Sequence, residues 1–356
     1  MSPKNKYSKF FVPPDFLEMP SVAIEMSEKG VRYLSVKKTD KGLLPAKTGF
    51  IPVSKGVIRF GEVVKKNEIV KILDKIKKTT GTTFARVSLP EEKTYIFKVR
   101  IPKVEEKEIR QVLEFKIEEN VPLSAAEAIF DYEIISHQKK SSHMDLIVSA
   151  VSSKTIDEIS AVLADAGLQP VCFGLDSKNT ARSVVKENNE QTLVVADIKD
   201  NQIVLSLVLD GLVWQTSTVN FGASTFTDAL KKYYDISLEE AEKLKQDRLY
   251  TDSKESMEIF SYLINTVSAI KDEIFKFITY CNEREDVKDK VDKVILCGKD
   301  SAIVGMQKYL ELNLNLDVDI ANIWINNFSL ADYVPTIGAV ESLDYANVNG
   351  LNLYEL

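Results

Sequence analysis

The sequence contains few of the residues that build metal centres and nucleophilic triads. Of 356 residues, only three are cysteine and two are histidine. The cysteines lie in apolar surroundings and form no CxxC pair, which predicts buried, reduced thiols of the kind found in the cytoplasm. His137 and His143 both lie in a polar stretch. We therefore expect neither a histidine-based metal site nor a Ser-His-Asp triad.

Long apolar runs and an excess of positive charge are also absent from the sequence. No segment approaches the ~20 apolar residues that a transmembrane helix needs. The first residues do not lead into a secretory signal, and the net charge of −7 gives no general attraction to nucleic acid. An apolar share of 44% and a charged share of 28% are typical of a globular protein. These features predict a cytoplasmic chain of about two domains with no nucleic-acid partner.

The common catalytic motifs are missing too. There is no Gly-rich Walker loop, no G-x-S-x-G elbow and no HExxH sequence. The acidic pairs Glu105-Glu106 and Glu239-Glu240 begin predicted helices, where a negative charge offsets the helix dipole. These motifs therefore predict no catalytic residue.

The apolar pattern predicts a mixed α/β chain whose second half repeats the order of the first. A strand–turn–strand lies at residues 21–37, followed by alternating strand and helix patterns. Residues 192–219 begin a second series with three strand-like runs, and Asp210-Gly211 is a hairpin signal between two of them. A last helix is predicted at about 334–343. The repeated order indicates an internal duplication.

A series of short motifs has an order and spacing that is specific to one family. The motifs are Gly56–Val63, Val87–Pro90, Ile109–Pro122, Phe130–Tyr132, Ala164–Pro170, Asp235–Lys245 and Ile337–Ala339. Together they resemble the PilM family of type IV pilus and competence assembly proteins, within the actin, Hsp70 and FtsA superfamily. The resemblance covers nearly everything from Pro20 to Leu343. It implies an α/β actin-like ATPase fold of two duplicated halves, 1A and 2A, with an inserted subdomain called 1C.

This resemblance also implies a division of the chain into five parts. They are an extended N-terminal arm at 1–20, subdomain 1A at 21–56 and 137–178, the inserted subdomain 1C at 57–136, the second half at 179–343, and a C-terminal tail at 344–356.

The resemblance further implies a membrane-anchored partner. In the family, a groove beside subdomain 1C accepts the cytoplasmic N-terminal segment of PilN, an inner-membrane protein. Such a partner would hold this chain at the inner membrane beside other pilus assembly proteins. Alternate side chains of the strand at 94–101 point to opposite faces. The aromatic face is expected to be core, and the other face offers the candidates for peptide contact: Ile96, Lys98 and Arg100.

Three loops that would hold ATP and Mg²⁺ in the superfamily are altered here. In the first, Glu25 replaces an aspartate and Ser27 a glycine, and Glu28 adds a negative charge. A carboxylate ~4 Å from a phosphate costs about 4 kcal/mol per unit charge at an effective dielectric constant of ~20. Lys29 would offset part of this cost. The first loop is therefore predicted to be impaired for phosphate binding.

The second and third loops depart from the family in the same direction. The second keeps Asp197 but has Lys199 in place of a glycine, and the third has Lys299 and Asp300 in place of glycines. If a nucleotide binds, the residues implied are Glu25, Ser27, Lys29, Asp197, Lys199, Gly298 and Gly305. We predict a non-enzymatic scaffold that uses no cofactor.

Two alternatives stay open at this stage. The first is a working Mg-ATP switch, in which Glu25 and Asp197 orient Mg²⁺ and water and Lys199 meets the phosphate. The second is an FtsA-like filament former that self-associates head to tail. A separate hypothesis concerns Leu351–Tyr354, which resembles the start of the Ile-Asn-Leu-Leu-Pro pattern of PilN-type segments. The tail would then occupy the partner groove, and a frayed terminus is the alternative.

Overall fold

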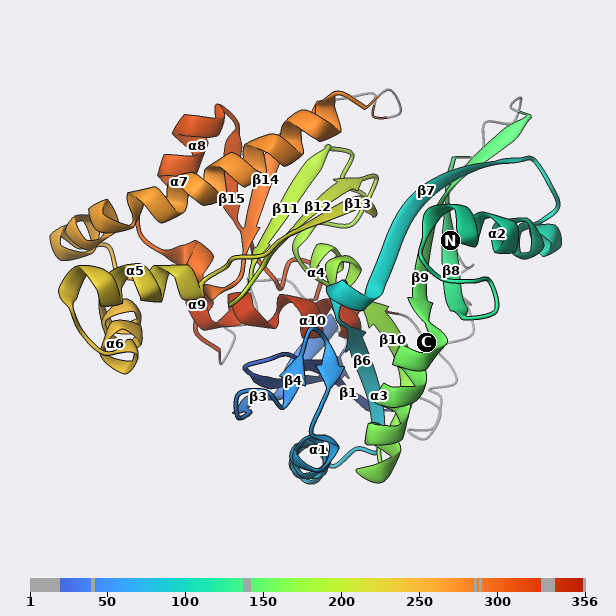
Figure 1. Cartoon of the computed structure of the whole chain (residues 1–356), viewed down its shortest axis with the longest axis horizontal. Helices are drawn as coiled ribbons and strands as arrows, with labels where there is room; N and C mark the ends of the chain where they lie inside the picture. The colour runs from blue at the N-terminus through green and yellow to red at the C-terminus, as the bar shows by residue number, and fades with distance from the viewer. Residues whose placement is uncertain are drawn as a thin grey trace.

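Two five-stranded sheets of the same topology form the two halves of the molecule (Figure 1). The computed structural model describes residues 20–39, 42–136, 142–284, 287, 290–327 and 337–354. The first sheet has the strand order β10-β6-β1-β2-β3 and the second the order β13-β12-β11-β14-β15. In each sheet an antiparallel meander leads, through its first strand, into two parallel strands. The predicted internal duplication is confirmed.

The large sheets and their helices have these bounds. The first sheet contains β1 (Ser21–Met26), β2 (Gly30–Thr39), β3 (Gly42–Pro52), β6 (Phe84–Leu89) and β10 (Gln169–Leu175). The second contains β11 (Leu193–Ile198), β12 (Ile203–Leu209), β13 (Leu212–Val219), β14 (Lys293–Cys297) and β15 (Asp317–Ile320). The helices beside them are α1 (Lys66–Thr80), α3 (Ser153–Asp165), α4 (Asp176–Val184), α5 (Ser224–Tyr234), α6 (Leu238–Arg248), α7 (Lys254–Asn282), α8 (Met306–Leu314), α9 (Ala339–Ser342) and α10 (Ala346–Asn352). Short elements are β4 (Ile58–Arg59), β5 (Glu62–Val63), η2 (Glu91–Lys93), η3 (Lys299–Ala302) and η4 (Leu343–Tyr345).

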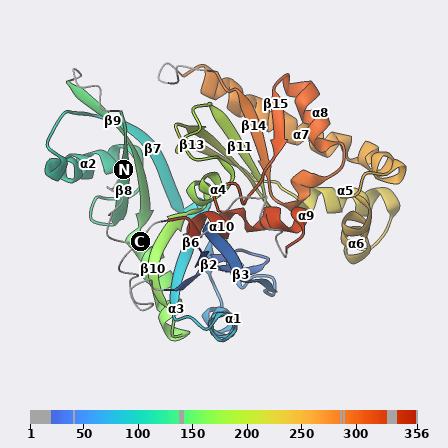
Figure 2. The same cartoon turned by 180° about the vertical axis from the view of Figure 1, so that it is seen from behind.

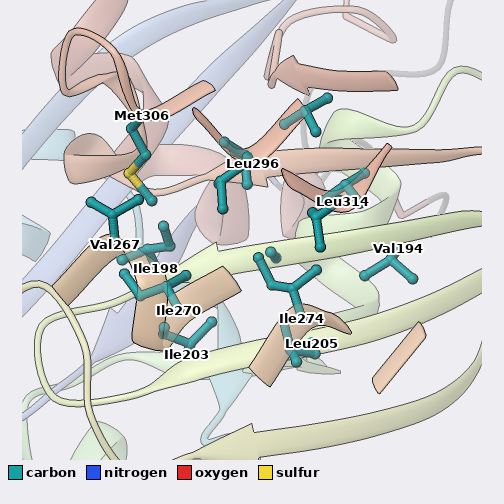
Figure 3. Close-up of a cluster of buried hydrophobic side chains, with 14 of the residues drawn as sticks. Val194, Ile198, Ile203, Leu205, Val267, Ile270, Ile274, Leu296, Met306 and Leu314 are labelled. Atoms are coloured by element: carbon teal, nitrogen blue, oxygen red, sulfur yellow. The ribbon is translucent and has the colours of Figure 1, made fainter. Parts of the chain in front are cut away.

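The central strands β1 and β11 are buried almost along their whole length. Helices cover both faces of such a strand, which is why both segments read as unbroken apolar runs in the sequence. Helix α7 covers one face of the second sheet, with its apolar stripe Val267, Ile270 and Ile274 turned toward β11 and β12 (Figure 3). The carboxyl ends of the two central strands carry the first two loops predicted to meet a nucleotide.

The inserted module is smaller than the sequence predicts, and both of its boundaries lie further toward the C-terminus. It is a three-stranded sheet of order β7-β9-β8, made of β7 (Thr94–Pro102), β8 (Ala128–Ser136) and β9 (His143–Ser152), with α2 (Glu106–Asn120) on one face. The predicted boundaries at 57–136 are wrong, because β6 pairs in parallel with β1 and β10 in the first large sheet. The strand β9, predicted to belong to subdomain 1A, is the centre of the inserted sheet. Apolar alternation identifies a strand but not the sheet that it joins.

Residues 346–352 form a buried helix between the two halves, so this part of the predicted C-terminal tail is not the frayed terminus that was the alternative to a groove-bound segment. Helix α10 packs on α4 at the centre of the molecule in both views (Figure 1; Figure 2). The helices touch at Gly350, where a Cβ would lie 1.7 Å from the Asn179 backbone oxygen. The last helix predicted at 334–343 is confined to the short α9 within the described residues. The predicted N-terminal arm lies outside the described residues except for Pro20.

Candidate functional site

A cleft lies between the two halves, where the carboxyl ends of β1 and β11 face each other. A lysine of the second half lies in this cleft. Lys199 follows β11 directly, and its Nζ is 3.3 Å from Glu25 Oε1 and 3.7 Å from Asp197 Oδ2. It also forms an ion pair with Asp176, the first residue of α4. The three carboxyl groups are buried. Glu25 and Asp176 lie close together because β1 and β10 run parallel in one sheet, and the carboxyl ends of parallel strands meet at one edge. Asp197 and Lys199 reach them from the carboxyl end of β11 in the second sheet.

A second cation, Arg32 on β2, binds the other oxygen of Glu25. Its Nη1 is 3.2 Å from Glu25 Oε2 and its Nη2 is 3.3 Å from Asp344 Oδ2. Asn347 of α10 donates a hydrogen bond to Glu25 Oε1 at 3.1 Å. Burial raises the pKa of Glu25, but Lys199, Arg32 and this hydrogen bond outweigh it and hold the pKa below its ordinary value. Glu25 is therefore ionised, and both of its oxygens bind groups of the protein itself.

The cluster holds more carboxyl groups than cations. Burial and the charges of Glu25 and Asp197 raise the pKa of Asp176 well above its ordinary value, although Lys199 opposes them. Burial also raises the pKa of Asp197 and that of the nearby Glu91. Burial lowers the pKa of Lys199, but its carboxylate neighbours reverse this and raise it well above the ordinary value. Among the described residues, the buried Oδ1 of Asp176 has no hydrogen-bond partner.

The turn after β1 is closed on itself. The Ser27 N–H donates to Gly30 O at 2.9 Å, the Gly30 N–H donates to Ser27 O at 3.2 Å, and the Ser27 hydroxyl donates to Gly30 O at 3.0 Å. Gly30 is required by β3, because a Cβ there would lie 2.5 Å from Ile51 O. Phosphate-binding turns offer unpaired backbone N–H groups to the anion. In this turn, both of these N–H groups bond within the loop.

The charged residues of this turn reach across the cleft to the second half. Lys29 forms an ion pair with Asp200. Glu28 accepts a hydrogen bond from the Asn201 side-chain amide at 3.2 Å and another from the Phe60 N–H at 3.0 Å. The first and second loops are therefore joined by contacts between their own side chains.

The loop after β11 covers the N-terminus of α5. The N–H groups of Ala223 and Ser224 donate to the backbone oxygens of Lys199 and Asp200, both at 2.8 Å. Gly222 permits this approach, because a Cβ there would lie 2.1 Å from Lys199 O. Unpaired amides at the start of a helix are a common phosphate site. Here two of them bind the loop.

The third loop places one of its two substituted residues, Asp300, in a buried ion pair. Asp300 lies 3.1 Å from Lys245 Nζ and accepts a hydrogen bond from the Tyr250 hydroxyl at 2.7 Å. Gly298 lies in the cleft with φ of 84°, whereas Gly305, with φ of 90°, is the N-cap of α8 and packs against Phe260. Every predicted nucleotide residue except Gly305 therefore lines the cleft.

The cleft contains two cavities, of about 420 and 380 Å³. The first is bounded by the β4–β5 hairpin and Pro90, and the second by Tyr250, Gly298 and Asp344. Five residues line both cavities: Glu25, Ser27, Lys29, Lys199 and Asp200.

The predicted peptide-contact residues lie on β7, which is an edge strand of the inserted sheet. Ile96 packs against the apolar cores of the second half. Lys98 Nζ is 4.4 Å from the centre of the Trp214 ring and 3.6 Å from Asp145. Arg100 is more exposed and binds both oxygens of Asp145, at 2.6 and 2.9 Å. The three side chains lie on the same face of β7. The end of this face that carries Ile96 packs near β13.

Sequence reasoning missed three members of the charged cluster. Asp176 had a usable signal, because it comes directly after a predicted strand whose carboxyl end had to reach the same edge of the sheet. Arg32 and Asn347 had none, since an arginine inside a strand and an asparagine near the C-terminus are ordinary surface residues by pattern.

Comparison with known proteins identifies the family. A family model described as Type IV pilus assembly protein PilM matches residues 23–353. The chain belongs to the PilM family. This PilM-family chain is similar to a solved PilM-PilN type IV pilus biogenesis complex, with a TM-score of 0.76 and 15% identity over 94% of this chain and 98% of that one.

Two further solved structures share the actin-like ATPase fold with this PilM-family chain. The ethanolamine utilization protein EutJ from Carboxydothermus hydrogenoformans has a TM-score of 0.58 and 13% identity, covering 96% of this chain and 91% of its own. MreB5 of Spiroplasma citri bound to ADP also has a TM-score of 0.58, with 12% identity over 94% of this chain and 96% of its own. The predicted fold is confirmed. In the part of the chain that the structure describes, no helix has the length and apolarity to cross a bilayer.

Proposed function

We propose that this PilM-family protein is a non-enzymatic scaffold of type IV pilus or DNA-uptake machinery with a degenerate nucleotide site. The observation that carries this proposal is the position of Lys199. Its ammonium group contacts Glu25, Asp176 and Asp197 at the carboxyl ends of the two central strands. In an actin-like ATPase these carboxylates would face Mg²⁺ and phosphate, and here they face a cation of the chain itself.

The energetics of the cluster favour this proposal. Mg-ATP would have to displace Lys199 and separate Lys29 from Asp200, while Glu28 would repel the phosphates. Removing one partner from a buried ion pair costs about 3–5 kcal/mol. A loss of that size weakens binding by a factor of roughly 100 to 1,000 or more. The amides of Ser27, Gly30, Ala223 and Ser224 already bond within the chain, so a phosphate would have to compete for them.

A Mg-ATP switch is the second candidate, and the surplus of carboxyl groups favours it. Asp176 Oδ1 is buried without a hydrogen-bond partner among the described residues. A divalent ion beside it would use that oxygen, and Lys199 would then turn toward phosphate. A cation with few carboxylate ligands and several waters is the usual form of bound Mg²⁺.

Calorimetric titration with ATP and Mg²⁺ separates the two candidates. For the unmodified chain we expect no heat of binding up to millimolar nucleotide. Lys199→Gly restores the glycine of the family loop, and Glu25→Ala removes a ligand that a metal would need. Micromolar binding to the unmodified chain that disappears in Glu25→Ala would refute the scaffold and support the switch. An FtsA-like polymer would appear instead as concentration-dependent sedimentation.

The partner we propose is the cytoplasmic tail of a PilN-like inner-membrane protein, which would hold this chain at the cytoplasmic face of the inner membrane. The support is the fold shared with the PilM-PilN complex and the presence of an inserted sheet whose outer strands, β7 and β8, each pair with only one strand among the described residues. An extended peptide gains main-chain hydrogen bonds at a sheet edge and side-chain contacts beside it. Because Ile96 and Lys98 are packed against the second half, Arg100 is the predicted contact residue that a peptide can reach.

A labelled peptide with the Ile-Asn-Leu-Leu-Pro pattern tests this partner by fluorescence anisotropy. A hydrogen bond to a charged group contributes about 1.5–3 kcal/mol, so Arg100→Ala is expected to weaken binding at least ten-fold. Lys107→Ala is the matched control, since Lys107 is exposed on α2. Equal affinity of both variants would remove Arg100 from the groove, and no binding by the unmodified chain would refute the peptide mode itself.

A further inference from the structure

The hairpin β4–β5 presents the most exposed large apolar side chain among the described residues. Phe60 is 76% exposed and is the first of the two turn residues between Arg59 and Glu62. The hairpin lies between α1 and the centre of the molecule (Figure 1). Among the described residues nothing buries this ring, and Phe60 also lines the first cavity of the cleft.

The backbone at Phe60 makes its identity more unusual. Phe60 and Gly61 have φ of 46° and 73°, the pattern of a two-residue hairpin that favours Asn-Gly. A bulky residue with positive φ is a conformational outlier. The turn is nevertheless fixed, because Glu28 accepts the Phe60 N–H at 3.0 Å and Gly61 lies against Pro90. Neither burial nor backbone preference explains a phenylalanine here.

Exposed cations outnumber exposed acids in residues 55–66, the segment that carries this ring, on a chain whose net charge is −7. The exposed residues beside it form what we call the hairpin knob: Lys55, Arg59, Phe60, Val64, Lys65 and Lys66. The acidic residue of the hairpin, Glu62, is paired with Lys93 at 2.6 Å. Lys65 has Glu68 at 3.4 Å, in an exposed pair that is expected to be weak. The knob is therefore apolar at its tip and cationic along its flanks, with the exposed Glu28 and Glu92 on the side that lines the cleft.

We propose that the hairpin knob contacts an anionic lipid surface. An aromatic ring held outward enters the boundary between headgroups and acyl chains, and the surrounding lysines and arginine bind the headgroups. The excess of exposed cations in this segment favours an anionic bilayer as the occupant. The contact does not depend on a PilN-like partner and would place the mouth of the cleft toward the membrane.

A second exposed phenylalanine supplies the matched control. Phe115 on α2 is 74% exposed, but its neighbours Glu114, Glu118 and Glu119 are acidic. An anionic surface would repel this region, so equal exposure with opposite charge predicts opposite behaviour. Comparing the two positions separates lipid insertion from the general stickiness of an exposed ring.

Co-sedimentation of the full chain with vesicles tests the proposal. We expect binding to vesicles of equal parts phosphatidylcholine and phosphatidylglycerol, and none to phosphatidylcholine alone. Phe60→Asn creates the preferred Asn-Gly turn, so it should keep or raise the melting temperature while weakening vesicle binding about ten-fold. Lys65→Glu with Lys66→Glu should weaken it at least as much, and more at low salt. Phe115→Asn should change nothing.

Two results would overturn the proposal. One is the absence of binding to the anionic vesicles. The other is binding that Phe60→Asn and the double lysine variant leave unchanged, or that Phe115→Asn reduces equally. In the first case an acidic protein surface would become the better occupant of the knob.

Discussion

Glu25 and Asp197 occupy equivalent places in the two duplicated halves, yet their surroundings shift their pKa values in opposite directions. Each lies near the carboxyl end of the central strand of its sheet, and each is buried beside Lys199. The pKa of Glu25 is lowered and that of Asp197 is raised. The two halves share a topology, but the charged groups around the two carboxyl groups differ.

The difference comes from the number of cations and donors that each carboxylate faces. Glu25 has Lys199 at 3.3 Å, Arg32 at 3.2 Å and the Asn347 amide at 3.1 Å. Asp197 has Lys199 at 3.7 Å and the Thr180 hydroxyl at 3.4 Å, and burial dominates. The comparison shows that one lysine, shared unequally, stabilises the charge of one half more than that of the other.

Removing the shared cation should have the largest effect. In Lys199→Met, three buried carboxyl groups lose their common partner, and removing one member of a buried pair costs about 3–5 kcal/mol. The Lys199 side chain is 20% exposed, so we expect a loss near the lower end, measured by urea unfolding at pH 7. The loss should shrink as the pH falls, because the unpaired carboxyl groups then take up protons.

Lys29→Ala is the control for this experiment. Its pair with Asp200 also crosses the cleft, but the side chains are 47% and 40% exposed, and such pairs contribute about 0–1 kcal/mol. Equal losses in Lys29→Ala and Lys199→Met would mean that the buried cluster does not hold the halves together.

Neutralising each carboxylate in turn should give effects of opposite sign. The folded pKa of Glu25 lies below 4.5, so its stabilising contribution exists above the unfolded pKa and is lost as the pH falls through the folded value. The folded pKa of Asp197 lies above 3.8, so its contribution exists below the unfolded pKa and is lost as the pH rises through the folded value. At pH 7 we expect Glu25→Gln to destabilise by about 2 kcal/mol and Asp197→Asn to stabilise by up to about 1 kcal/mol. Thermal unfolding followed from pH 4 to 8 checks both signs, and a shared sign would contradict the comparison.

Much of this arrangement could be predicted from the sequence, because strands and their ends are local features. The runs of β1 and β11, the stripe of α7 and the order of the loops all follow from apolar periodicity. The substitution of Lys199 for a glycine was also visible in the sequence, and Lys199 lies in the cleft.

The missing parts depend on contacts between distant segments. The sheet membership of β6 and β9 is decided by pairing partners, which the pattern of one strand does not specify. Helix α10, with the sequence Ala-Asn-Val-Asn-Gly-Leu-Asn, has a composition typical of a loose terminus. Its polar side chains can be buried because they find hydrogen-bond partners in distant segments. Asn347 bonds Glu25 and Asn179, and Asn349 bonds Asn327.

The smallest expected loss among the buried partners of Glu25 concerns the donor that only Glu25 has. Asn347→Ala removes the hydrogen bond to Glu25 and leaves the Asn179 amide with Ser88 at 3.3 Å, for a loss of about 1–2 kcal/mol at pH 7. Below the folded pKa of Glu25 the carboxyl group is protonated with or without Asn347, so the part of this loss that depends on charge should disappear. Asn349→Ala is the matched control, because Asn349 bonds Ser183, Ile323 and Asn327 but not Glu25. Its loss should be similar in size and independent of pH, and a pH-independent loss in Asn347→Ala as well would show that α10 does not set the charge of Glu25.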